Sequence, residues 1–136
     1  MGSSIFSGYS IEKEPFLQVG HCKMWKVYNA VKKENGTKVC LFSFEKRQLD
    51  SYSTYEKTEG LKLISNEAKN LVKYKHPNIL GVIEQMVEDK HSIAFIGERI
   101  SCSLSSILNS KNKPSEIEMK IILRELLATV KFIHDE

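Results

Sequence analysis

This 136-residue sequence lacks the features that mark several special classes of protein. Its three cysteines, Cys22, Cys40 and Cys102, share no CxxC spacing, which argues against a disulfide framework or a zinc site and favours a reducing compartment. It shows no signal peptide and no apolar run of transmembrane length. The formal charge of +3 is mild and its basic residues are scattered among acidic ones, which argues against a nucleic-acid partner. We therefore expect a soluble cytoplasmic protein.

What the sequence does contain is enough apolar residues for one globular domain, at 41% of the chain, and a clear strand pattern. Asn35-Gly36 lies between two apolar, β-rich runs, and this dipeptide is a strong signal for a tight hairpin turn. A second pair of apolar runs flanks the polar residues 88–90. The predicted strands cover residues 16–20, 24–31, 37–44, 79–87 and 91–96.

Apolar residues recur at helical intervals from Leu61 onward, with polar residues between them. This spacing predicts an amphipathic helix that ends before His76-Pro77, because a residue before proline avoids the helical region. The stretch before this helix, Asp50 to Thr58, is polar and rich in tyrosine, and it is predicted to be a mobile loop.

Residues 101–109 predict a short helix, and a longer one follows it. Ser115 with Glu118 three residues on has the pattern of a capping box, which opens a helix running to about Ile133. The apolar stripe of this helix is too wide for a surface helix on a small domain. We therefore expect self-association through the Ser115 to Ile133 helix, or docking of that helix back on the sheet.

The order of these elements and three of their segments resemble a protein kinase. Glu67 followed by His76-Pro77-Asn78-Ile79 resembles the glutamate of kinase helix C and the turn into the next strand. Residues 98–100 fall where the kinase hinge lies, shortly before Leu104 on the next helix. Residues 39–46 resemble the third strand of the SCY-like pseudokinases, in which an aromatic residue replaces the catalytic lysine.

This resemblance implies an α+β fold, a protein-kinase-like small lobe with an antiparallel sheet of about five strands and helix C. The hinge and the first two helices of the large lobe then follow. The implied division is an N-terminal tail over residues 1–14, the small lobe over 15–97, and the hinge with the start of the large lobe over 98–136. The kinase catalytic loop and metal ligands come after this point, so we expect no catalytic and no metal-binding residue in the chain.

The resemblance also locates a degenerate phosphate loop. An active kinase covers the ATP phosphates with a loop of three glycines, because only glycine lets backbone amides approach phosphate oxygens closely. In the aligned stretch 20–27, Gly20 alone remains, and Trp25 replaces the last glycine. Trp25 is expected either to obstruct phosphate binding or to pack as a strand aromatic in the core.

The lysine that pairs with the phosphates should lie fifteen residues after Val27, and that position holds Phe42. Lys38 and Lys46 do not fit the surrounding pattern of an apolar triplet and a small residue. Without its lysine, Glu67 as the helix C glutamate loses its ion-pair role and is either paired with another Lys or His or solvated.

An adenine-shaped pocket could survive around these positions. Gly97 aligns with the gatekeeper, so the pocket opens backward unless Phe42 or Phe95 fills it. We expect Phe42 to fill it, with no cofactor and weak or no ATP binding. The residues of this degenerate ATP pocket are Val19, Gly20, Val27, Cys40, Gly97, Glu98 and Ile100.

Three interpretations follow for function. The first is a catalytically inactive pseudokinase fragment that acts as a scaffold; the family resemblance implies coat or trafficking partners and a peripheral location at Golgi or endosomal membranes. The second is an atypical active serine/threonine kinase fragment in which Lys46 or Lys23 substitutes for the missing lysine. The third is a small adaptor unrelated to kinases.

Overall fold

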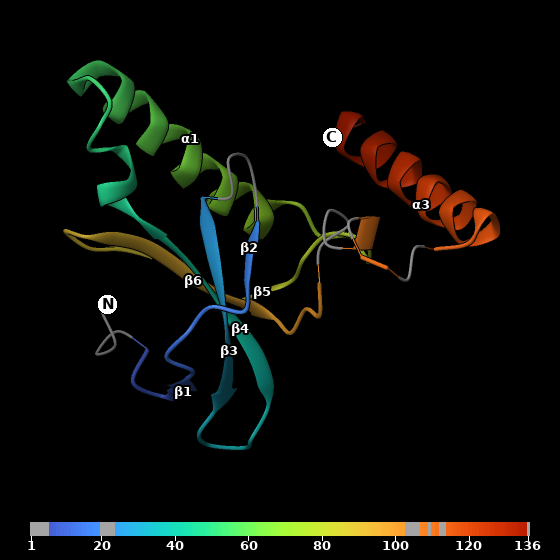
Figure 1. The fold of residues 1–136 in the computed structure, drawn as a ribbon, viewed down its shortest axis with the longest axis horizontal. Helices are drawn as coiled ribbons and strands as arrows, with labels where there is room; N and C mark the ends of the chain where they lie inside the picture. Colours follow the sequence, from blue (N-terminus) through green and yellow to red (C-terminus); the bar gives the residue numbers. More distant parts are fainter. Residues whose placement is uncertain (1–5, 20–23, 103–106, 109, 112–113, 136) are drawn as a thin grey trace.

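The structure, a computed structural model, describes residues 6–19, 24–102, 107–108, 110–111 and 114–135. An antiparallel sheet forms its centre, one helix lies across a face of the sheet, and the last helix stands to one side (Figure 1). This is the α+β arrangement expected from the sequence. In chain order the elements are β1 (Tyr9–Ile11), β2 (Leu17–Val19), β3 (Trp25–Lys32), β4 (Lys38–Glu45), the 3₁₀ helix η2 (Lys46–Leu49), α1 (Thr54–Lys73), β5 (Val82–Glu88), β6 (Ser92–Glu98) and α3 (Glu116–His134).

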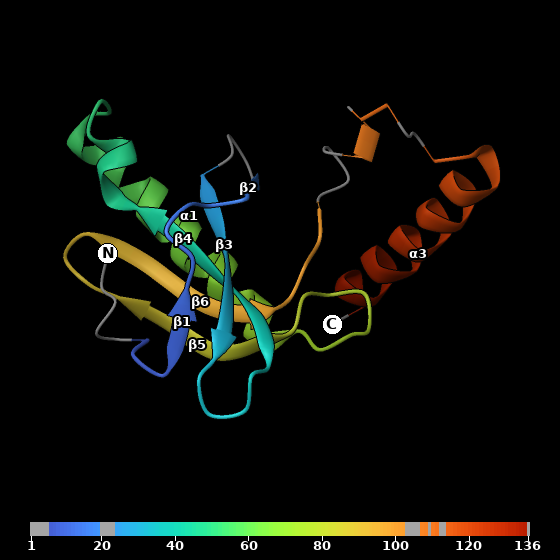
Figure 2. The same ribbon diagram turned by 60° about the horizontal axis from the view of Figure 1, so that its bottom comes forward.

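The described residues form a six-stranded sheet with the order β1-β3-β4-β6-β5, and β2 also pairs with β3. β1 and β2 lie along the same edge of β3: β1 pairs with its end at Ala30 to Lys32, and β2 pairs with its start at Trp25 to Val27. Figure 2 shows this edge, with β1 beside β3 and β4 behind them. The central strands β4 and β6 are buried along almost their whole length.

Both predicted hairpins are confirmed. β3 and β4 are joined by a turn in which Gly36 has φ +72°, a backbone conformation that favours glycine. The amide of Thr37 donates to Asn35 Oδ1 at 3.0 Å, which holds the turn. β5 and β6 form the second hairpin, and β5 begins at Val82, three residues later than expected.

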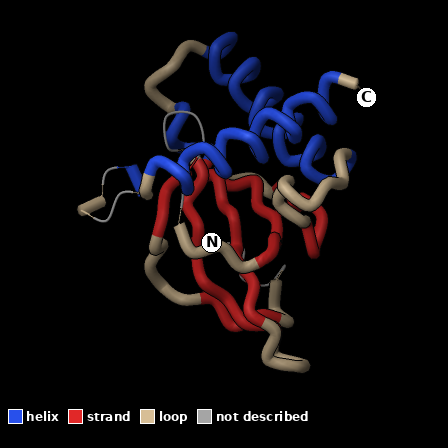
Figure 3. Tube along the Cα trace, turned by 90° about the vertical axis from the view of Figure 1, so that its right-hand side faces the viewer, coloured by secondary structure: helices blue, strands red, loops and turns tan. Residues whose placement is uncertain are grey.

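Helix α1 packs against one face of the sheet. Figure 3 shows the helices gathered on one side of the strands. Ile64 and Ala68 are the buried residues of α1, so the predicted apolar face is confirmed. The prediction of a loop over Asp50 to Thr58 was wrong for its second half, because α1 already begins at Thr54. Ser53 caps the helix by accepting from the amide of Glu56 at 3.2 Å, which satisfies one of the free donors of the first turn.

The face of the sheet away from α1 carries a second apolar cluster. Phe6 and Tyr9 from the N-terminal segment pack over Tyr28 and Leu41 there. The sequence had predicted residues 1–14 as a tail, and the structure places three of them in strand β1 instead. A three-residue strand is too short to show an alternating pattern, which is why the sequence did not reveal it.

Helix α3 has the predicted capping box, with reciprocal bonds between Ser115 and Glu118. It is fastened to the turn after α1: Asn78 donates to Glu125 Oε2 at 2.7 Å, and the His76 and Phe132 rings lie 4.8 Å apart. Its apolar stripe stays exposed along its length, so in the described structure this stripe does not pack on the sheet. Self-association stays a prediction. The exposed residues are Ile117, Ile121, Leu123, Leu126, Leu127, Val130 and Ile133.

Two further expectations concern helices. The predicted short helix over residues 101–109, including Leu104, lies mostly outside the described residues. Among the helices that the structure describes, none has the length and apolar character needed to cross a bilayer.

Candidate functional site

Three aromatic side chains fill the position where the sequence predicted a degenerate nucleotide pocket. Phe42 of β4 and Phe95 of β6 are cross-strand partners, and their rings stack with centroids 4.9 Å apart and an interplanar angle of 5°. Trp25 of β3 meets Phe95 edge to face at 5.3 Å. Each of the three is 3% exposed. Phe42 therefore lies in the core as expected, and of the two alternatives for Trp25 the structure has core packing. We call Trp25, Phe42 and Phe95 the aromatic stack.

Gly97 makes room for this stack. A Cβ atom added at Gly97 would lie 2.9 Å from Cε1 of Phe42 and 3.4 Å from the carbonyl oxygen of Gly81. The first distance is shorter than Cβ contacts in folded proteins allow, so a side chain at the gatekeeper position would displace the Phe42 ring. The open gatekeeper predicted from the sequence is thus occupied by Phe42 itself.

The predicted roof of the pocket forms part of the same core. Val27 and Cys40 are fully buried, and Val27 lies opposite Phe42 in the sheet register. Val19 and Ile100 are partly buried and pack against the cluster. The structure thus brings these residues together as neighbours of the aromatic stack, whereas Gly20 falls outside the described residues.

A small cavity of about 120 Å³ remains beside the stack. Sites for drug-sized ligands usually have about 300–1,000 Å³, so this space is well below the ordinary size. Glu67 of α1 reaches its edge but is itself exposed, and it forms no ion pair within the described part of the chain. The lining residues are Val19, Trp25, Phe42, Glu67, Leu71, Leu80 and Phe95.

The predicted hinge is held by bonds to its neighbours. The Glu98 amide donates to the carbonyl oxygen of Gly81 at 2.9 Å, and the Glu98 carboxylate accepts from the Gly81 amide at 2.9 Å. The backbone of Glu98 therefore has its donor already engaged. Within the described residues, neither Arg99 nor Ile100 makes a backbone-to-backbone hydrogen bond.

Arg99 is a hinge residue that the sequence analysis did not single out. Its guanidinium donates to the carbonyl oxygens of Val39 at 3.0 Å and Ala30 at 2.8 Å. These bonds fasten the hinge to the ends of β4 and β3. Arginine has five donors in a fixed fork, so one side chain can hold both strands. No local pattern marked Arg99, because its partners lie far away in the sequence.

Of the two lysines proposed as substitutes, Lys46 forms its ion pair away from Glu67. Lys46 follows β4 and pairs with Glu88 at 2.6 Å. Lys23 lies outside the described residues. Within the described part, no three His, Cys, Asp or Glu side chains gather where they could hold a metal ion.

Comparisons with known proteins agree with this geometry. The sequence matches the protein kinase domain family over residues 14–136. The chain is 32% identical over 111 residues to the protein kinase domain-containing protein ppk32 of Schizosaccharomyces pombe, and 31% identical over 103 residues to SCY1-like protein 2 of Homo sapiens. These matches cover 76% and 75% of the chain, but only 14% and 11% of the relatives' own length.

The fold is also that of a solved kinase structure. The crystal structure of Rad53 residues 1–466 in complex with AMP-PNP superposes with a TM-score of 0.69 at 23% identity, and the match covers 96% of this chain and 31% of that one. The element order, the hinge, the turn after α1 and the family match lead to one conclusion: this chain belongs to the protein kinase domain family, in its small-lobe region, and is related to the SCY1-like proteins.

Proposed function

We propose that this chain is part of a pseudokinase, a kinase-like domain that works by binding protein partners and does not transfer phosphate. The observation that carries this proposal is Phe42, which occupies the lysine position and is stacked on Phe95 in the core. In protein kinases the lysine on this strand pairs with helix C and positions the phosphates, and catalysis depends almost entirely on positioning and charge stabilisation. A phenyl ring supplies neither.

The packing around Phe42 adds a second argument. A nucleotide base needs an open slot between the sheet and the hinge, whereas here the aromatic stack leaves about 120 Å³. Opening the slot would require the Phe42 ring to leave a close-packed core, which carries a large free-energy cost. We therefore infer weak or no ATP binding and no need for a cofactor.

The relatives support the class of protein and suggest its context. ppk32 is a protein kinase domain-containing protein, and both ppk32 and SCY1-like protein 2 are much longer than this chain. The SCY-like resemblance supports a scaffold for coat or trafficking components, peripheral at the cytoplasmic side of Golgi or endosomal membranes.

A second candidate, an atypical active kinase, is favoured by two observations. The cavity beside the stack borders Glu67, and the described residues make no backbone-to-backbone hydrogen bond with Ile100. Against it, Lys46 is engaged with Glu88 and lines a different pocket. The active-kinase hypothesis therefore needs Lys23 or another lysine to supply the charge, and it needs an opened aromatic stack.

Calorimetric titration with ATP, with and without Mg²⁺, tests the proposal. The titration is run on this chain and on a version extended through the rest of the kinase domain. No saturable heat up to millimolar nucleotide in either version is expected. Saturable binding that requires Mg²⁺ in the extended version would overturn the pseudokinase reading and favour the active kinase.

A further inference from the structure

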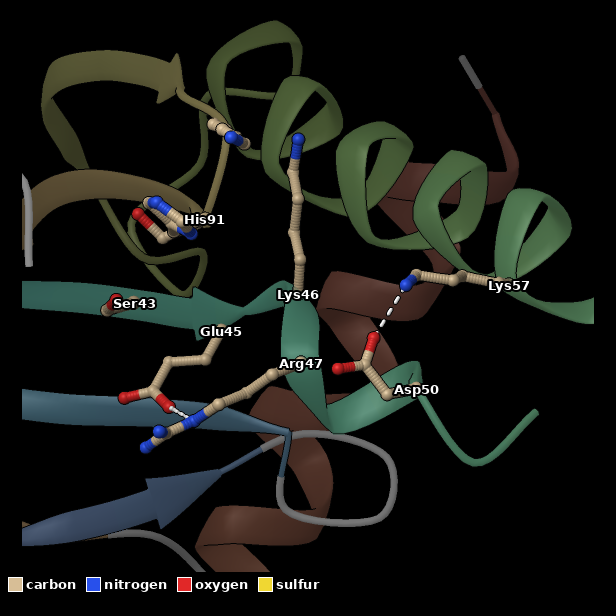
Figure 4. Close-up of a pocket in the computed structure, with 9 residues that line it drawn as sticks. Ser43, Glu45, Lys46, Arg47, Asp50, Lys57 and His91 are labelled. Carbon is tan, nitrogen blue, oxygen red and sulfur yellow. Dashed lines mark hydrogen bonds and ion pairs between the residues drawn. The ribbon is translucent and has the colours of Figure 1, made fainter. Parts of the chain in front are cut away.

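A second pocket, distinct from the aromatic stack, lies where the end of β4, the start of α1 and the β5–β6 turn meet (Figure 4). Its volume is about 400 Å³, within the usual range of ligand sites of about 300–1,000 Å³. It shares no lining residue with the cavity beside the aromatic stack. We call it the cationic pocket, after the side chains Lys46, Arg47, Lys57 and Lys90 that line it.

The charges of this pocket are unbalanced in favour of cations. Its lining has four Lys or Arg side chains against the two carboxylates of Glu45 and Asp50. Lys46 also pairs with Glu88 outside the lining, at 2.6 Å, so the local formal charge is +1 when Glu88 is included. Lys90 forms no ion pair with any residue that the structure describes. An anion is therefore the class of ligand that this pocket favours.

The ion pairs that occupy part of the pocket are exchangeable. Figure 4 shows two of them on either side of Lys46: Arg47 with Glu45, and Lys57 with Asp50, each at 2.6 Å. The Lys57 and Asp50 side chains are 39% and 62% exposed, and exposed pairs of this kind contribute only about 0–1 kcal/mol. A ligand with more charge than one carboxylate can displace such partners at little cost.

Hydrogen bonds fix the backbone that carries the cationic side chains. The Asp89 carboxylate accepts from the amides of His91 and Ser92, both at 2.7 Å, which fixes the turn that carries Lys90. These backbone hydrogen bonds, the one from His91 first, lower the pKa of Asp89 below its usual value. The amide of Lys46 donates to the His91 carbonyl oxygen at 2.8 Å, which joins the turn to the start of η2. A ligand therefore has little backbone ordering to impose, and it orders mainly the lysine side chains.

We propose that the cationic pocket binds the phosphate group of a phosphorylated peptide segment in a partner protein. A phosphate monoester has a charge between −1.5 and −2 at neutral pH and three strong acceptor oxygens, so it can bridge two or three ammonium groups. A single carboxylate could only replace Asp50 or Glu88 with an equal charge. The buried Ser43 also lines the pocket and adds a neutral hydroxyl donor, whereas the Ser92 hydroxyl already donates to Asp89 Oδ1 at 3.3 Å.

The shape of the site favours a peptide over a membrane surface. The cations gather around a recess, whereas a flat bilayer would need them on a raised or level surface. The carboxylates of Glu45 and Asp50 at the same site would repel an extended anionic surface more than one inserted phosphate. A phosphorylated side chain is narrow enough to enter the recess.

The test is a titration of the ¹⁵N-labelled chain followed by its amide spectrum. The probe is the peptide acetyl-Ala-Ala-phosphoserine-Ala-Ala-amide, and the unphosphorylated peptide is its control. We expect saturable shifts at Lys46, Lys57 and Lys90 with the phosphopeptide alone. Lys90→Ala and the double variant Lys46→Ala/Lys90→Ala should weaken binding, the double variant by about tenfold, as expected for lost hydrogen bonds to a charged group.

Two further variants sharpen the test. Asp50→Asn removes the carboxylate that competes for Lys57, so it should strengthen binding by about two- to fivefold, the equivalent of one exposed ion pair. Lys38→Ala removes an exposed lysine outside the pocket and should leave binding unchanged. Lys90 is exposed, so its variant tests the site even if the double variant does not fold.

Several outcomes would overturn the proposal. One is the absence of shifts at 10 mM phosphopeptide, because about 10 mM is the weakest dissociation constant that such a contact would give. Another is a loss of binding in Lys38→Ala as large as that in Lys90→Ala. Binding to phosphatidylcholine vesicles containing phosphatidylinositol 4-phosphate, without binding to the peptide, would assign the pocket to a membrane instead. ATP binding that disappears in Lys46→Ala/Lys90→Ala would come from this pocket, so it would leave the proposed function intact.

Discussion

Two places in this small lobe could hold a ligand, and they have opposite character. At the nucleotide position, Trp25, Phe42 and Phe95 fill the space with rings and leave about 120 Å³. At the cationic pocket, charged side chains from three parts of the chain surround about 400 Å³. The first place contributes to stability through close packing, and the second contributes little stability but keeps a site open. The difference teaches that a kinase lobe can be close-packed at the nucleotide position and still have an open, charged recess elsewhere on its surface.

The largest effect on the free energy of unfolding is expected at the aromatic stack. Phe42→Ala removes a buried ring and leaves a cavity, so it should lower the free energy of unfolding by about 3–5 kcal/mol. Urea unfolding followed by circular dichroism measures this loss. Phe16→Ala is the matched control, because Phe16 is 37% exposed and its loss should cost less than about 1 kcal/mol. Equal costs for the two variants would contradict the packing of Phe42 described here.

The close approach of Gly97 to Phe42 predicts the next largest effect. Gly97→Ala places a Cβ 2.9 Å from the Phe42 ring, so overpacking should cost about 1–3 kcal/mol. Gly8→Ala is the control, since nothing lies within 4 Å of its Cβ position. In a double-mutant cycle, Phe42→Leu should reduce the cost of Gly97→Ala, because the smaller side chain yields space. Strict additivity would mean that the two residues do not share this space.

A smaller effect concerns the pH dependence of stability, which Glu45 contributes at the rim of the cationic pocket. Burial of Glu45 raises its pKa, but the hydrogen bond from Arg47 and the charge of Lys26 outweigh burial and bring the pKa below the usual value of 4.5. A carboxyl with a lowered folded pKa stabilises the fold above its unfolded pKa, and this contribution is lost as pH falls through the folded pKa. Glu45→Gln should therefore lose less stability than the wild type when unfolding is measured from about pH 5 downward.

The matched control for this pH dependence is Glu34→Gln, at a glutamate whose side chain is 82% exposed. Its unfolding curve should follow that of the wild type over the same pH range. If Glu45→Gln also follows the wild type, the pairs with Arg47 and Lys26 do not stabilise the fold.

The smallest effect is expected where the cationic pocket is most exposed. Lys57→Ala breaks the pair with Asp50, which should change the free energy of unfolding by less than about 0.5 kcal/mol. The same variant should weaken phosphopeptide binding in the titration described above. A loss of stability comparable to that of Phe42→Ala would show that the pocket is a structural element, and the contrast between the two sites would fail.

Much of the fold was predictable because its signals are local. Asn35-Gly36 indicated the first hairpin, and the Ser115–Glu118 box indicated the start of α3. The start of α1 was missed although Ser53 and Glu56 have the spacing of a capping pattern, because the polar, tyrosine-rich composition around them favoured a loop. Strand β1 has three residues and offers no pattern at all.

The aromatic stack and the cationic pocket also differ in whether local sequence could predict them. Phe42 could be assigned to the lysine position by counting from Val27, so the filled site was predictable from one aligned strand. The cationic pocket combines Lys46, Lys57 and Lys90, which only the folded sheet and helix bring together. Arg99 was missed for the same reason, since its two carbonyl partners come from other strands. Properties that depend on long-range contacts need the structure.

The most direct test of the central claim, that Phe42 fills the nucleotide position, is an NMR measurement of nuclear Overhauser effects on the Phe42 ring. Spectra are recorded with and without millimolar ATP and Mg²⁺. The account predicts contacts from this ring to the Gly97 α-protons and the Phe95 ring in both spectra, with no shifts at Val27 or Ile100. Loss of the Gly97 contacts on adding nucleotide, together with shifts at Val27 and Ile100, would contradict it by showing a ring that moves aside for ATP.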